Sequence, residues 1–254
     1  MTAQLARTLS SVAVAALTAA CASYSEIPIE TPIRPTMDVS AFQRVLVAGF
    51  ISGGTDDVDG NLETTRLLRS QLRTKSGLRV IDSDALPLME VASEGRTAAG
   101  AAGQAPATPA TPKDEKEMDL YSGVFANVEY WKKIGEEYQQ PLIVTGTVLF
   151  TPHQRNSIVQ REEEVYDSFG RRRVVPVRTY MERKGFVLTP KFIFIDGRTG
   201  TVMHSQSARE EILYNANQAT PALSSYFELM DRVLPSFLSA LSSQKVKGTR
   251  VLLQ

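Results

Sequence analysis

The chain offers few residues whose type and spacing could perform catalysis. Its 254 residues include two histidines, His153 and His204, and neither has a second ligand at the spacing of a metal site. No Gly-x-Ser-x-Gly elbow presents a serine nucleophile. The single cysteine, Cys21, excludes an internal disulfide and a thiolate metal cluster. We therefore expect a protein that is not an enzyme and that binds no metal or dissociable cofactor.

A glycine-rich and acidic loop, residues 52–59, is a further candidate for ligand chemistry. Its backbone could cradle an anion, but it matches neither phosphate-loop pattern. Its acids, Asp56, Asp57 and Asp59, suggest calcium, yet the distal bidentate Glu of an EF-hand loop is missing. A solvated turn is favoured, and a small-ligand binder or enzyme acting through this loop is a weakly supported third hypothesis.

A predicted hairpin carries the clearest candidate for binding. Residues 158–166 and 173–181 have strand composition and flank the turn 167–170. Aromatic and guanidinium groups, which are enriched in interface hot spots, gather at this turn. The candidate partner-binding residues are Tyr166, Phe169, Arg171, Arg172 and Arg173. Alternatively, the hairpin is a twisted edge whose charges only prevent aggregation.

The charge pattern of this hairpin suggests how its strands align. Glutamates 162–164 lie on one arm and arginines 171–173 on the other, so cross-strand pairs between them are expected to set the register. Pro176 predicts an edge strand, because proline cannot donate a ladder hydrogen bond.

The N-terminus has the composition of an export signal. Arg7 precedes an apolar and small-residue stretch, residues 8–20, that is too short for a comfortable transmembrane helix. Residues 18–21, Thr-Ala-Ala-Cys, resemble the lipobox of bacterial lipoproteins, with Thr18 in place of the commoner Leu. Alternatively, an ordinary signal peptidase cuts after Ala22, because residues 20–22 form an Ala-x-Ala site.

The resemblance to lipoproteins implies a chemistry for Cys21. In that family the cysteine sulfur receives a diacylglyceryl group and the leader, here residues 1–20, is removed. The new amino group of the cysteine then receives an acyl chain. Several acyl chains anchor durably, since each buried CH₂ contributes about 0.8 kcal/mol. The absence of Asp at position 22 implies delivery to the outer membrane, facing the periplasm.

Composition narrows the other partners. Lys+Arg 28 balance Asp+Glu 28, which argues against nucleic acid, and nothing beyond residue 25 is a long enough apolar run to span a bilayer. Residues 21–41 are rich in proline and small polar residues, so they predict a lipidated flexible tether. Residues 42–250 then form one α/β domain, and the low-complexity residues 95–117 are expected to be a disordered insertion in it.

The predicted elements of that domain alternate in type. Buried strands are expected at 44–50, 78–82 and 141–150, with the first two parallel and joined by a helix at 61–72 that Gly77 caps. Residues 121–138 have apolar side chains at helical spacing, and this Trp and Tyr stripe is interpreted as core packing rather than a ligand site. Strands at 186–195 and 201–213 flank the turn 196–200, and a helix at 223–241 follows. The prediction is a mixed β-sheet with flanking helices and an exposed hairpin.

Three of these segments also support a family resemblance. Their order along the chain resembles that of an α/β domain found in several envelope proteins. The segments are the strand at 44–50, the helix and link that end at 143–147, and the turn 196–200. Members are the curli-secretion channel lipoprotein, the lipoprotein activators of penicillin-binding proteins and the N-terminal domain of the Tol–Pal propeller protein. The resemblance covers roughly residues 42–242 and implies a partner-binding domain, usually without catalysis.

Two functions follow as hypotheses. The first is a non-enzymatic envelope lipoprotein, attached to the membrane by its lipid, that binds another envelope protein as regulator or assembly scaffold. The second is a structural subunit that associates with its own copies in a secretion or channel assembly. A transmembrane barrel is not favoured, because charge runs along both arms of the hairpin and its faces do not alternate as lipid-facing strands do.

Overall fold

The computed structural model describes residues 24–98, 111–166, 168–215, 218, 221–242 and 244–253. These residues form two compact units. The larger unit spans Pro35–Ser242, and the smaller one joins the segment up to Arg34 with the segment from Ser243. The predicted signal peptide and Cys21 lie outside the described residues.

The larger unit is built on a mixed six-stranded sheet, as predicted. Parallel pairing joins β3 and β4 to the two edges of β2, and β5 then pairs antiparallel with β4. Both β6 and β7 add antiparallel to the far edge of β5. The strands are β2 (Arg44–Gly54), β3 (Arg79–Ile81), β4 (Leu142–Tyr166), β5 (Arg172–Asp196), β6 (Val202–Ser207) and β7 (Glu210–Asn215).

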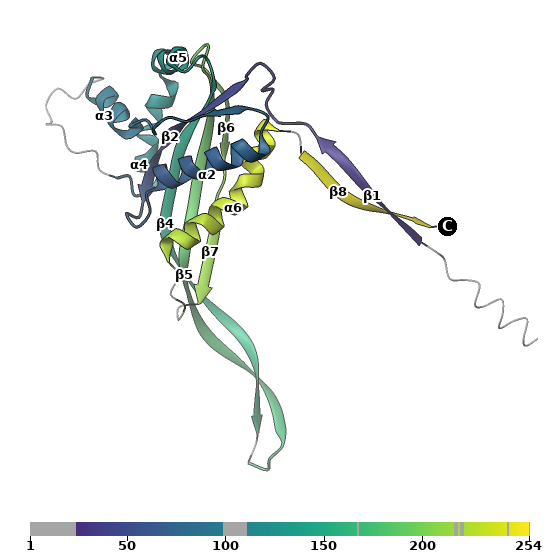
Figure 1. Cartoon of the computed structure of the whole chain (residues 1–254). Coiled ribbons are helices and arrows are strands. Elements are labelled where there is room, and N and C mark those ends of the chain that lie inside the picture. The colour runs from purple at the N-terminus through teal and green to yellow at the C-terminus, as the bar shows by residue number, and fades with distance from the viewer. Residues whose placement is uncertain are drawn as a thin grey trace, which may run out of the picture. The chain divides into compact units, whose positions relative to one another are not determined.

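Helices cover both faces of this sheet (Figure 1). Helices α2 (Gly60–Lys75) and α6 (Ala222–Leu241) pack on one face with Val144 and Val148. The other face, with Ile143 and Leu149, packs on the remaining helices. These are α3 (Leu88–Ala98), α4 (Glu115–Asp119), the 3₁₀ helix η1 (Ser122–Ala126) and α5 (Val128–Glu137). Strict alternation along β4 thus places apolar side chains in two separate cores, which is why this segment is apolar on both sides.

The predicted helix over residues 121–138 is broken in two. Asn127 ends η1 and begins α5, and its side-chain oxygen accepts a hydrogen bond from the Tyr130 backbone N–H at 3.1 Å. Asparagine favours such a capping position over a helix interior, so it interrupts the helical stripe. Trp131 is fully buried, and its indole N–H donates to the Val124 carbonyl at 2.9 Å, which confirms the core interpretation of this stripe.

The predicted disordered insertion at 95–117 is too long at both ends. Residues up to Ala98 belong to α3, and α4 begins at Glu115, where Asp114 caps it by accepting from the Glu117 N–H at 2.8 Å. Residues 99–110 lie outside the described residues. Residues 95–98 (Gly-Arg-Thr-Ala) and 115–117 (Glu-Lys-Glu) contain no large apolar side chain, so the sequence shows no helical stripe there.

The acidic loop at 52–59 is largely accounted for by the fold. Strand β2 continues through Gly54, and Asp59 caps α2 by accepting from the Leu62 N–H at 2.9 Å. The predicted cap at Gly77 is wrong. Helix α2 ends at Lys75 and its C-cap is Ser76, which has an extended backbone and whose N–H donates to the Leu72 carbonyl at 3.0 Å.

The edge of β2 that extends past β3 is covered by other parts of the chain. The Phe50 N–H donates to the Asn61 side chain at 2.8 Å, and the Val47 carbonyl accepts from Arg69 at 2.9 Å. Gly54 donates to the Pro112 carbonyl at 2.8 Å. This edge is therefore closed to another strand.

The predicted strand over residues 201–213 is two strands in the structure. Strands β6 and β7 follow each other along β5 and are separated at Ala208, whose N–H donates to the Pro190 carbonyl at 3.0 Å.

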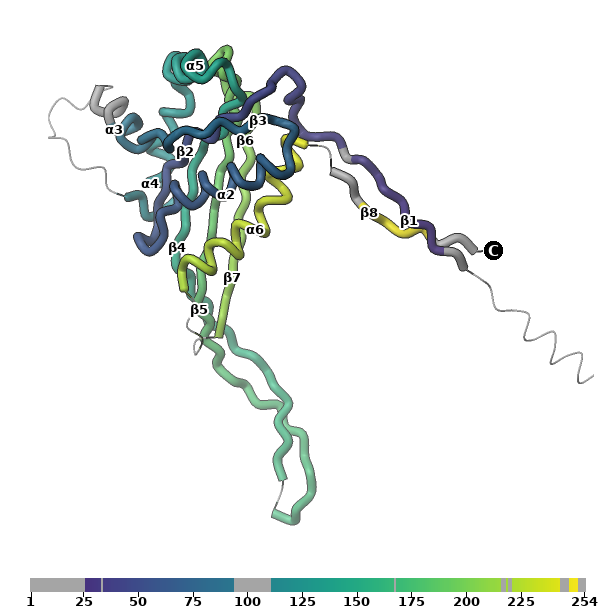
Figure 2. Tube along the Cα trace, viewed as in Figure 1, coloured from purple at the N-terminus to yellow at the C-terminus, as the bar shows by residue number. Residues whose placement is uncertain are grey.

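The smaller unit is a two-stranded antiparallel ribbon of β1 (Tyr24–Ile33) and β8 (Gln244–Leu253) (Figures 1 and 2). Residues 24–33 of the predicted flexible tether are thus a paired strand, and the single domain predicted for 42–250 ends at Ser242. Composition alone misled here, because Pro28 and Pro32 suggest an unpaired segment. Proline is tolerated at the edge of a sheet, and both strands of a two-stranded ribbon are edges.

Candidate interaction arm

The strands β4 and β5 continue past the sheet as a two-stranded projection, which we call the arm (residues 156–182). The last residue pair joined by a third strand is Arg183↔Asn215, between β5 and β7. Beyond it, the register runs without interruption from Asn156↔Glu182 to Tyr166↔Arg172. At ~3.3 Å per residue the arm is roughly 35 Å long. It extends away from the helices and sheet of its own unit (Figure 2).

All five residues predicted to bind a partner lie at the end of this arm and are exposed. Phe169 is 81% exposed, and the Arg171 guanidinium lies 5.4 Å from the centre of its ring. Tyr166 pairs across the ribbon with Arg172, and Val165 with Arg173. The structure therefore brings the predicted residues together at the tip, around residues 168–170.

The predicted register from glutamates facing arginines is only partly right. Glu163 and Glu164 lie directly opposite Val175 and Val174, not opposite arginine. Arg172 and Glu164 form a diagonal ion pair across the ribbon. The observed register differs from the charge-matched one by three positions, because Glu164 pairs with Val174 rather than with Arg171.

Sequence reasoning missed an apolar pair in the middle of the arm. Ile158 and Tyr180 are directly opposite each other and are 72% and 62% exposed. Paired residues of this ribbon have numbers of equal parity, so Ile158, Tyr180, Tyr166 and Val174 share one face. This face also carries Glu162, Glu164 and Arg178, so the apolar side chains alternate with charged ones along it. Only the register reveals this, because the residues are separated in sequence by charged positions.

The two strands of the arm differ in charge near the tip. Glutamates 162–164 lie on β4, whereas Arg172, Arg173 and Arg178 lie on β5. No third strand pairs with either one within the described residues of the arm. The arm thus has one acidic strand and one basic strand, each with an open edge.

Energetics favour a covered arm. A two-stranded ribbon on its own is at best marginally stable in water, because it buries little apolar surface. The tip residues also place aromatic area in solvent, where burial against a partner would gain about 25 cal/mol per Å². An arm of this kind is expected to be ordered most strongly when another surface packs on it.

Other functional chemistry is sparse in the part of the chain that the structure describes. No cluster of three or more His, Cys, Asp or Glu side chains with metal-binding geometry occurs among these residues. His153 lies 3.7 Å from a Glu211 carboxylate oxygen, and the His204 ring stacks on Phe194 with centres 5.8 Å apart. Among these residues, no helix has the length and apolar content needed to cross a membrane.

Comparisons with known proteins give remote structural likeness. No family model matches the chain, and no curated protein sequence matches it. The chain is similar to the crystal structure of lipoprotein GNA1162 from Neisseria meningitidis, at 14% identity and a TM-score of 0.34, over 76% of this chain and 96% of that one. It is also similar to a putative neuraminyllactose-binding hemagglutinin homolog from Helicobacter pylori, at 12% identity and a TM-score of 0.34, over 83% and 88%. Likeness at this level assigns the chain to no family.

Proposed function

We propose that this chain is a non-enzymatic envelope lipoprotein that binds another envelope protein through the tip of its arm, as regulator or assembly scaffold. In this proposal, acyl chains on Cys21 attach it to the outer membrane and the folded units face the periplasm. The intact mass of the mature chain tests the anchor. An unmodified sulfur, or a chain that starts at Ser23, would remove it.

The observation that carries the binding proposal is the exposed aromatic and arginine tip on a projecting ribbon. Phe169 and Tyr166 offer large apolar area with few rotatable bonds, and the neighbouring arginines offer planar groups that form bidentate hydrogen bonds. The position of the tip beyond the sheet lets a partner reach these side chains without any change in the two cores.

The tip is tested by replacing Tyr166, Phe169 and Arg171, Arg172 and Arg173 with serine in the native cell. We expect crosslinking to the partner, read out by mass spectrometry, to fall at least tenfold, since hot-spot residues contribute about 2 kcal/mol or more each. A matched control replaces Leu120, which is 61% exposed on the larger unit, with serine and is expected to keep the crosslinks. Equal capture by both variants would exclude the tip.

The segregated charge of the arm favours a second function, association of this chain with its own copies. If β5 of one copy paired antiparallel with β4 of the next at the same level, the basic strand would lie beside an acidic one. Such a head-to-tail contact uses two different surfaces and leads to a ring or a filament.

Charge reversal separates this second function from the first. One variant replaces glutamates 162–164 with lysine, and another replaces arginines 171–173 with glutamate. We expect each variant alone to be monomeric by light scattering, because residues 162–164 and 171–173 then carry charges of the same sign and repel between copies. Mixing the two should restore association. A monodisperse monomer for the unchanged chain at every concentration would rule out the self-association.

A further inference from the structure

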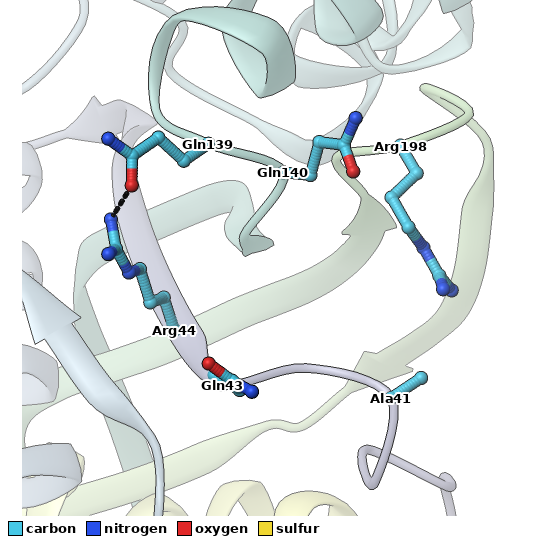
Figure 3. Close-up of a pocket in the computed structure, with 6 residues that line it drawn as sticks. All are labelled: Ala41, Gln43, Arg44, Gln139, Gln140 and Arg198. Atoms are coloured by element: carbon cyan, nitrogen blue, oxygen red, sulfur yellow. Dashed lines mark hydrogen bonds between the residues drawn. The ribbon is translucent and has the colours of Figure 1, made fainter.

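A polar hollow lies at the end of the sheet where β2 begins and β5 ends (Figure 3). It has a volume of about 310 Å³. Side chains from the start of β2, the segment between α5 and β4, and the turn after β5 surround it. They are Ala41, Gln43, Arg44, Gln139, Gln140 and Arg198.

The backbone that presents the two glutamines is strained. Gln139 and Gln140 have φ of 63° and 55°, in the left-handed region that glycine normally occupies. Gln140 also precedes Pro141, where helical conformations are disfavoured. Neighbouring bonds hold this geometry. The Gln140 N–H donates to the Gly135 carbonyl at 2.6 Å, and the Gly197 N–H donates to the Pro141 carbonyl at 3.0 Å. Strain of about 1–3 kcal/mol per residue, kept where glycine would remove it, is typical of functional positions.

The side chains of the hollow are mainly hydrogen-bond donors. Arg44 donates through Nη1 to Oε1 of Gln139, which leaves the amide NH₂ of that glutamine as donor. Arg198 donates to Asp196 from Nε at 3.1 Å and from Nη2 at 2.9 Å, and its guanidinium lies 4.9 Å from the centre of the Phe42 ring. These contacts fix the orientation of Arg198 and leave its Nη1 group as a further donor.

Positive charge is also in excess at this end of the sheet. Arg44 and Arg79 are paired neighbours at the starts of β2 and β3, where like charges repel. Asp196 pairs with Arg198 of the hollow and Asp82 pairs with Arg73, so the unbalanced charge belongs to Arg44 and Arg79. A bound anion would relieve the repulsion between Arg44 and Arg79.

We infer that this hollow binds an oxyanion, a phosphate or carboxylate group carried by a small molecule, lipid headgroup or peptide terminus. Arg44 supplies the charge and donates to one oxygen beside Gln139, while Gln140 and the oriented Arg198 offer donors from the other side (Figure 3). Arg79 adds to the positive field from the neighbouring strand. The site is independent of the arm, so it stands whether or not the tip binds a protein.

Calorimetric titration of the full chain in detergent, at low ionic strength, tests this site with inorganic phosphate and with succinate as probes. We expect saturable binding of at least one probe, about tenfold weaker in Arg44→Gln, because a charge-assisted hydrogen bond is lost. Arg66→Gln, on the exposed face of α2, is the matched control and should bind as the unchanged chain does. Arg79→Gln, which removes charge without touching the hollow's lining, should weaken binding less, and it replaces Arg44→Gln if that variant does not fold.

The two probes distinguish which chemical group the hollow prefers. Binding of phosphate alone indicates a phosphate-bearing ligand, and binding of succinate alone indicates a carboxylate. No saturable binding of either probe at millimolar concentration, or equal binding by Arg44→Gln and Arg66→Gln, would overturn the inference.

Discussion

Among single residues, Asp196 shows how this fold handles a nearly buried charge. Burial by itself would raise the pKa of its carboxyl, but hydrogen bonds from the Arg198 side chain and backbone N–H, and the charge of that guanidinium, outweigh it and lower the pKa below the ordinary value of 3.8. The carboxylate is therefore held in its charged form, and it positions Arg198 at the oxyanion hollow.

This pair predicts a pH-dependent contribution to stability. A carboxyl with a lowered folded-state pKa stabilises the fold above about pH 4, and that stability is lost as the pH falls further through the folded-state pKa. We expect Arg198→Gln to lower the midpoint of urea unfolding at pH 7 and to lose this difference below pH 4. Trp131, the single tryptophan, is buried and reports the unfolding by fluorescence. If the difference between the two urea midpoints stays constant between pH 7 and pH 3, the role given to Asp196 is contradicted.

At the scale of elements, the arm is separate from both cores. None of its described residues belongs to the buried side chains of either cluster, and its backbone pairing joins β4 to β5. Several glycines of the body, in contrast, lie where packing leaves no room for a side chain. A methyl group on Gly135 of α5 would lie 1.7 Å from the Gly197 carbonyl oxygen, so this helix and the turn after β5 must stay in close contact.

An arm deletion should therefore leave the body folded. We expect replacement of residues 156–182 by Asn-Gly, a sequence that favours two-residue hairpins, to change the thermal midpoint by only a few degrees. Circular dichroism and Trp131 fluorescence check this, with crosslinking as the functional readout. A broad, non-cooperative transition would show that the arm supports the core, and the tip substitutions would then need a different interpretation.

The elements could be predicted from sequence where local signals were strong. The strand at 44–50, the parallel pair with β3, the final helix and the hairpin turn 167–170 follow from periodicity and turn residues. The tip residues were also identifiable, because aromatic and arginine side chains on a turn are exposed by their position. The Ile158–Tyr180 face and the hollow around Arg44 were not, since both depend on register and on the meeting of three distant segments.

Across the whole molecule, the least predictable feature is the pairing of β1 with β8. Residues at opposite ends of the described chain form every rung of this ribbon, from Tyr24↔Leu253 to Ile33↔Gln244, and no local pattern encodes such a contact. An ion pair between Lys247 and Glu30, 3.9 Å apart and solvent-exposed, adds little to its stability. Backbone pairing is thus the main force within this ribbon.

Removal of β8 should convert β1 into the flexible tether that its composition predicts. We expect a chain truncated after Ser242 to be cleaved faster by a glutamate-specific protease at Glu26 and Glu30, with no change in the thermal midpoint of the larger unit. N-terminal sequencing of the fragments locates the cuts. Equal cleavage rates in the full and truncated chains would indicate that β8 does not protect this segment.

The order in which the ribbon forms follows from where its strands lie in the chain. Translation supplies β1 first and β8 last, so β1 must wait, unpaired, while the intervening sequence emerges and folds. If Cys21 is acylated during export, the protein is already fixed to its bilayer during that wait. A chain that ends before β8 would then be anchored but would lack this ribbon.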